Sequence, residues 1–168
     1  MRHLAVIGLG IILLTVTGAV CRVLHTEWVR PDPILILVVY ISIFMKPGEG
    51  VLTAFVLGAI ADSFASTPWG MLMSASIVVW MFARHLRRFM QPNQSTALVG
   101  VMFITSLLFS MLIFVYLAAM GASDGVIWVN LKAVLPLAFI NAVLAVPVWS
   151  LAKLAWPPTT RRRFEMAV

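Results

Sequence analysis

The sequence from Gly50 to Gly70, GVLTAFVLGAIADSFASTPWG, carries a small or acidic residue at every fourth position of an apolar run. These residues are Gly50, Ala54, Gly58 and Asp62, and in a helix they form one stripe. Small residues at this spacing let two membrane helices approach closely, and an aspartate in lipid is costly unless another group compensates its charge. The stripe therefore predicts a helix-packing surface, either within the chain or with a partner.

The composition around this stripe excludes a soluble domain. Of the 168 residues, 62% are hydrophobic and 11% are charged, and the mean hydropathy is +1.03. These values predict an all-α integral membrane protein. We expect a single multi-spanning domain over residues 1–168, built as a compact bundle of about six transmembrane helices. The expected spans are 4–20, 33–45, 51–65, 69–83, 97–120 and 126–155, with a basic cytoplasmic tail over 156–168.

The second and third apolar segments are short for membrane spans. A hydrocarbon core of roughly 30 Å requires about 20 helical residues, and the segment at 33–45 is clearly shorter. The two segments are either tilted spans or a re-entrant hairpin that turns at Lys46–Gly50. Backbone polar groups are not tolerated in contact with lipid, so a re-entrant hairpin would have to be covered by the longer helices. Both arrangements return the chain to the same side.

Basic residues are distributed unevenly between the two sides of this arrangement. Nine of the twelve lie on one side and three on the other, so the positive-inside rule places both termini in the cytoplasm. The net charge of +6 is concentrated in short juxtamembrane clusters, which predict contacts with anionic lipid and no nucleic-acid partner. The residues of these clusters are Arg84, Arg87, Arg88, Arg161, Arg162 and Arg163.

The residues that usually perform chemistry are sparse and scattered. A single cysteine, Cys21, excludes an internal disulfide, and the three histidines have no metal-ligand spacing. The six acidic residues are spread among the ends of different segments, so no nucleophile, base and orienting group can be assembled. We therefore expect no metal, no cofactor and no enzymatic activity.

Asp62 is the acidic residue most deeply placed in an apolar helical register, and two interpretations of it stay open. At the membrane interface it would end a helix and accept backbone hydrogen bonds from the turn at Ser63–Thr67. Deeper in the membrane it would need a partner from another protein or from another segment, with Arg22 and Arg30 as the internal candidates.

The other polar residues inside apolar segments are interpreted as contacts between helices, with a substrate path as the alternative. Asn141 lies between Pro136 and Pro147 in the last segment. The two prolines predict a kink, and they free backbone carbonyls that Asn141 or a neighbouring helix would satisfy.

Residues 30 to 70 resemble the bacterial rod shape-determining protein MreD family. The resemblance rests on the residues Arg30-Pro31-Asp32 that open an apolar span, on the charged Lys46–Gly50 turn, on the Gly58–Asp62 segment, and on the closing Pro68-Trp69-Gly70. The segment layout of the whole chain is similar to that of the family. Pro33 departs from the family pattern, in which an aliphatic residue commonly follows the Pro-Asp pair.

This resemblance implies a subunit of the cell-elongation complex in the bacterial inner membrane, which takes part in the regulation of cell shape. It implies binding to the single-span protein MreC, and through it a link to MreB filaments and to the peptidoglycan synthases, RodA and a penicillin-binding transpeptidase. The family is also similar in fold to the substrate-binding subunits of energy-coupling-factor vitamin transporters. The alternative function is therefore a transporter subunit, whose cavity would be lined by Arg30, Asp32, Asp62 and Trp69.

Overall fold

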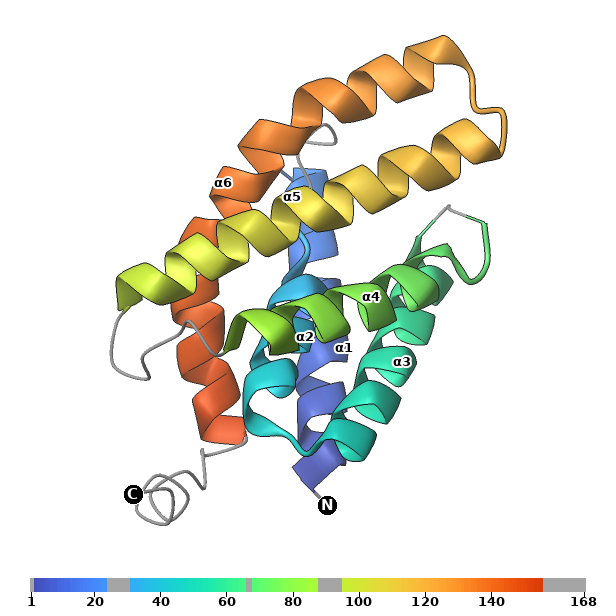
Figure 1. Cartoon of the computed structure of the whole chain (residues 1–168). Helices are drawn as coiled ribbons and strands as arrows, with labels where there is room; N and C mark the ends of the chain where they lie inside the picture. The colour runs from blue at the N-terminus through green and yellow to red at the C-terminus, as the bar shows by residue number, and fades with distance from the viewer. Residues whose placement is uncertain (1, 24–30, 66–67, 88–94, 156–168) are drawn as a thin grey trace.

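The computed structural model describes residues 2–23, 31–65, 68–87 and 95–155, and this part of the chain is entirely helical apart from short turns. The predicted all-α class is confirmed. Each helix overlaps one of the expected apolar segments (Figure 1). The helices are α1 (Arg2–Val23), α2 (Pro33–Phe44), α3 (Pro47–Phe64), α4 (Met71–Leu86), α5 (Ser95–Ala119) and α6 (Asp124–Ala155).

Three helices are long and apolar enough to cross a membrane. These spans are Leu4–Val23 in α1, Leu98–Ala119 in α5 and Gly125–Leu154 in α6. The chain is therefore a helical membrane protein. By contrast, α2 has 12 residues and rises only about 18 Å, which is less than the roughly 30 Å of a hydrocarbon core.

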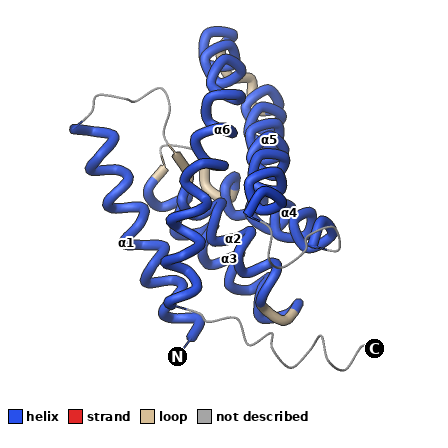
Figure 2. Tube along the Cα trace, turned by 90° about the vertical axis from the view of Figure 1, so that its left-hand side faces the viewer, coloured by secondary structure: helices blue, strands red, loops and turns tan. Residues whose placement is uncertain are grey.

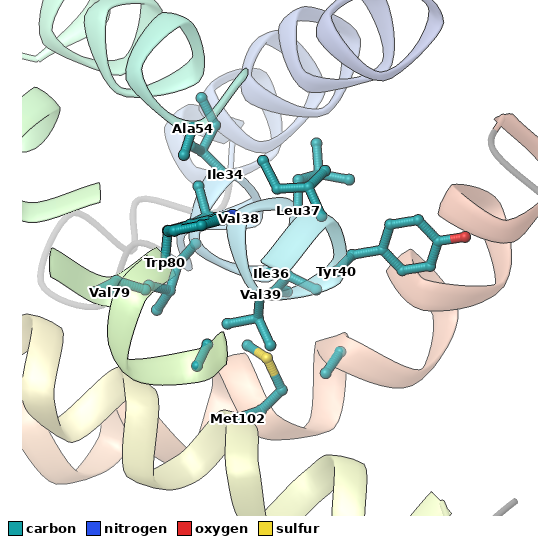
Figure 3. Close-up of a cluster of buried hydrophobic side chains, with 14 of the residues drawn as sticks. Ile34, Ile36, Leu37, Val38, Val39, Tyr40, Ala54, Val79, Trp80 and Met102 are labelled. Atoms are coloured by element: carbon teal, nitrogen blue, oxygen red, sulfur yellow. The ribbon is translucent and has the colours of Figure 1, made fainter. Parts of the chain in front are cut away.

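The short helix α2 lies at the centre of the bundle. Its sequence, PILILVVYISIF, is apolar on almost every side, and eleven of its twelve residues are buried, as expected for a helix without a polar face. It contacts all five other helices. Figure 3 shows Ile34 and Val38 packed toward Ala54 of α3 and Trp80 of α4, while Val39 points toward Met102 of α5.

At its C-terminal end α2 packs on α6 through aromatic rings. The ring centroids of Tyr40 and Trp149 are 4.9 Å apart in an edge-on arrangement, and Phe44 lies 5.6 Å from Trp149. These distances are typical of favourable aromatic pairs. The other helices thus enclose α2 on all sides. This meets the requirement that protein must cover a helix too short to span the membrane.

The turn between α2 and α3 lies at the same end of the bundle as the start of α1 and the end of α6 (Figure 1). Pro33, which departs from the family pattern, occupies the first turn of α2. Proline is favoured there because the first helical N–H has no intrahelical partner and the proline φ already suits a helix. The second proline therefore starts the helix and does not disturb it.

The last two helices form a hairpin, and α6 changes direction along its length (Figure 1). Pro136 and Pro147 lie inside α6, and each removes a backbone donor and crowds the preceding turn, which bends a helix. Gly121, with a φ of +71°, follows α5. Its N–H donates to the Ala118 carbonyl at 3.1 Å, and this left-handed ending is typical of glycine after a helix.

Candidate functional site at the contact of α3 and α4

Asp62, in the last turn of α3, is only 3% exposed and accepts three backbone hydrogen bonds from the start of α4. Its Oδ2 accepts from the Gly70 N–H at 3.1 Å and from the Met73 N–H at 3.0 Å. Its Oδ1 accepts from the Leu72 N–H at 2.9 Å. The carboxylate therefore satisfies N–H groups that a helix N-terminus leaves without partners, and its charge suits the positive end of the helix dipole.

The reason why α4 needs a cap from another helix lies in its own first residue. Gly70 is the N-cap of α4, has a φ of +91° and has no side chain that could accept a hydrogen bond. Serine, threonine, aspartate or asparagine normally fills this position. Asp62 takes over that role across the turn between the helices.

Asp62 thus follows the interpretation in which it ends a helix and accepts backbone hydrogen bonds. The donors that the structure shows, however, belong to Gly70, Leu72 and Met73 and not to the expected turn at Ser63–Thr67, of which residues 66 and 67 lie outside the described part. Of the two basic candidates, Arg22 is exposed at the end of α1, and Arg30 lies outside the described residues.

The other residues of the stripe lie in the same contact. Gly50, Ala54 and Gly58 are all buried. A Cβ atom on Gly58 would lie 2.7 Å from the Met73 Cα and 3.1 Å from the Leu72 carbonyl oxygen, and one on Gly50 would lie 2.8 Å from the Trp80 Nε1. The missing side chains let α3 and α4 approach more closely than any other residue would allow. The stripe lies against a helix of the same chain.

A second polar group fixes the N-terminal end of α2. Asp32 is its N-cap, and its Oδ1 accepts from the Ile34 and Leu35 N–H groups at 3.0 and 3.3 Å. The Asp32 N–H donates to the Asn141 Oδ1 at 3.0 Å, and the Asn141 Nδ2 donates to the Ser106 Oγ at 2.9 Å. Asn141 therefore ties the start of α2 to α5 and α6, instead of satisfying the carbonyls that the two prolines free.

Asn141→Ala is expected to lower the free energy of unfolding by about 1–3 kcal/mol, because it leaves a backbone N–H without a partner in a buried site. Thermal unfolding of the purified protein in detergent measures this loss. Asn130→Ala is the matched control, since Asn130 lies in the same helix and its Nδ2 bonds only to the Val126 carbonyl of its own turn. Equal losses in the two variants would contradict the link between helices.

The C-terminal end of α2 is capped by Arg84 of α4. The Arg84 Nη1 donates to the carbonyls of Ser42 and Met45 at 3.3 and 3.2 Å, and the guanidinium carbon lies 5.3 Å from the centre of the Trp80 ring. The last carbonyls of a helix have no intrahelical donors, so a cation placed there is stabilising. Arg84, which we expected to contact lipid, thus also has a role inside the chain.

Of the other arginines in the basic clusters, the structure describes one. Arg87 is half-buried at the end of α4. Arg88, Arg161, Arg162 and Arg163 lie outside the described residues, so their expected contacts with lipid stay predictions.

A groove opens beside the start of α2, between α1 and the contact of α3 and α4. It is lined by Leu14 of α1, by Pro31 and Asp32, by the last turn of α3 and by Leu72. Its volume is about 130 Å³, compared with roughly 300–1,000 Å³ for pockets that hold small-molecule ligands. Of the residues expected to line a ligand cavity, Asp32 lines this groove, whereas Asp62 is engaged with α4 and Trp69 is 85% exposed.

Sequence reasoning identified the stripe but missed the residues of other helices that contact it. Leu72, Met73 and the cap formed by Arg84 become visible only in the fold. One signal was available, because the segment Pro68-Trp69-Gly70 before α4 contains no side chain that caps a helix. This helix start without its own cap comes eight residues after an aspartate in an apolar segment. The pattern predicts that Asp62 supplies the missing cap of α4.

Comparison with known proteins adds one finding. The family model described as rod shape-determining protein MreD matches residues 1–154 of the chain. This match includes α1 to α5 and all but the last residue of α6. No curated protein and no solved structure matches the chain.

Proposed function

Because the chain belongs to the MreD family of rod shape-determining proteins, we propose that it is a non-catalytic scaffold subunit of the bacterial cell-elongation complex. In this role it binds an MreC-like single-span protein in the inner membrane. Through that partner it helps to couple MreB filaments inside the cell to RodA and a penicillin-binding transpeptidase outside. The family is one of rod shape-determining proteins.

This proposal rests on the unequal burial of the three long spans inside the chain. In α1 only 17% of the most apolar window is buried inside the chain, compared with 33% in α5 and 39% in α6. Figure 2 shows α1 at one edge of the bundle and α5 on the other side of α2. The stripe on α3 faces α4, so it offers no surface to a partner, whereas α1 does.

The exposed face of α1 has the character of a helix-packing surface. It combines the large residues Ile12, Val16 and Val20 with the small residues Thr15 and Ala19. Small residues beside branched ones favour close packing between membrane helices, which depends on van der Waals contact. We therefore place the span of the MreC-like partner along α1, with its outer end beside the groove at Leu14.

Val16→Trp is expected to reduce the amount of the partner that co-purifies with the tagged protein at least tenfold, since a bulky ring in the contact separates the helices. Val143→Trp is the matched control. Val16 and Val143 are 52% and 54% exposed, but Val143 lies on α6. Equal recovery of the partner with the two variants, at equal amounts of membrane-inserted protein, would reject α1 as the interface.

The orientation belongs to the same proposal. The turn between α2 and α3, which contains Lys46, lies at the end of the bundle where α1 begins and α6 ends (Figure 1). Lys153 lies in the last turn of α6, and Arg84 donates to the Ser42 and Met45 carbonyls beside the turn between α2 and α3. The positive-inside rule then supports cytoplasmic termini. The groove at Asp32 is much smaller than a vitamin-sized pocket, and this does not favour the transporter alternative.

A further inference from the structure

The inner end of the bundle contains a corner where the end of α2, the start of α3 and the last turns of α4 meet. Arg84 is held in this corner by its two hydrogen bonds to the Ser42 and Met45 carbonyls. Both bonds use the same nitrogen, Nη1, so the Nε and Nη2 donors of the planar group are directed away from these carbonyls. Arg84 is only half-buried, and this leaves part of its charge accessible from the membrane surface.

A second cation, Lys46, adjoins one of the residues whose carbonyl Arg84 contacts. Lys46 directly follows Met45, is exposed, and is the N-cap of α3 without a capping side-chain hydrogen bond. Glu49 in the first turn of α3 is the acidic residue nearby in the sequence. The corner therefore has an excess of positive charge at the end of a membrane bundle.

Trp80 forms the wall of this corner. Its ring lies beside the Arg84 guanidinium at 5.3 Å and packs against Gly50 in the first turn of α3. Trp80 is 5% exposed, and its Nε1 has no hydrogen-bond partner within the described part of the chain. The corner thus holds the Arg84 guanidinium beside an aromatic wall, with the exposed Lys46 at the end of α2 next to it.

We propose that this corner binds the phosphate of an anionic phospholipid headgroup, held between Lys46 and Arg84. A guanidinium presents parallel donors that match phosphate oxygens, and a lysine adds a compact charge. The ligand is a lipid because the corner lies at the end of the membrane spans, where basic residues are attracted to anionic headgroups. The site is distinct from the partner surface on α1 and does not depend on it.

The test uses the purified full-length chain in micelles of a neutral detergent, with phosphatidylglycerol as the probe. We expect phosphatidylglycerol to raise the Tm of the natural chain by several degrees, and phosphatidylcholine to raise it by less than half as much. Lys46→Gln should lose most of the shift. Lys132→Gln, which removes an equally exposed lysine near the start of α6, should keep it.

Three results would overturn the proposal. One is an equal shift in Lys46→Gln and the natural chain, and another is an equal shift with phosphatidylcholine. The third is an equal shift with inorganic phosphate alone, which would identify the ligand as a soluble anion. Lys46 is chosen because it makes no cap for α2, so its replacement leaves the folded chain available for the measurement, whereas Arg84→Gln also removes the cap on Ser42 and Met45.

Discussion

Asp62→Ala is expected to lower the free energy of unfolding by at least about 3 kcal/mol, because three backbone N–H groups at the start of α4 lose their acceptor and each buried unsatisfied donor costs about 1–3 kcal/mol. Asp62 is itself only 3% exposed, so its removal leaves these donors facing a site built for its carboxylate. Unfolding of the purified protein in mixed micelles, followed by helical circular dichroism, measures the loss.

Two further variants make this expectation specific. Ser63→Ala changes the neighbouring residue, which is exposed and bonds only to the Ala59 carbonyl of its own helix, and should change stability by less than about 0.5 kcal/mol. Asp62→Asn keeps one acceptor oxygen but turns an amide donor toward N–H groups, so it should also be destabilised. If Asp62→Ala and Ser63→Ala unfold alike, Asp62 does not hold α4.

Gly58→Leu is the second variant for which we expect a large loss of stability. Even the Cβ of alanine would lie 2.7 Å from the Met73 Cα, and this backbone atom moves only if α4 moves. Overpacking of this kind costs about 1–3 kcal/mol for a small addition, so we expect a loss in this range for Gly58→Ala. Gly58→Leu should lose more and should accumulate poorly in the membrane, as measured by immunoblotting of membrane fractions.

Gly100 offers the matched control for Gly58. It lies inside α5 and is exposed, and a Cβ there would meet no atom within 4 Å. Gly100→Leu should therefore keep or gain stability, by up to about 1 kcal/mol, because glycine is a poor helix former. A loss at Gly100 equal to that at Gly58 would show that the close contact between α3 and α4 does not govern the response.

The stripe on α3 shows what a membrane sequence does and does not encode locally. Small residues every four positions predicted a helix contact, since the spacing places Gly50, Ala54 and Gly58 on one face. The same pattern serves an internal helix or a partner equally well. Only the positions of Met73 and Trp80, which depend on the turn between the helices, assign it to α4.

The two ends of α2 illustrate the same limit. Asp32 precedes a proline and an apolar run, which is a local signal for a helix start, and the structure shows a cap there. The cap at the other end comes from Arg84, about forty residues later. From the distribution of basic residues we interpreted Arg84 as a sign of membrane topology and lipid contact. The sequence does not show that its guanidinium reaches back to Ser42 and Met45.

The most direct test of the scaffold function is affinity purification of the tagged full-length chain from its native membrane in mild detergent, with mass spectrometry of proteins and of extractable small molecules. Because the stripe packs inside the chain, Gly58→Leu and Asp62→Ala should reduce the folded protein itself and not its partner selectively. The predicted result is an MreC-like single-span protein that is recovered with the natural chain and with Val143→Trp, and lost with Val16→Trp. Recovery of a vitamin-like ligand or an energy-coupling module, with no single-span protein, would contradict the account.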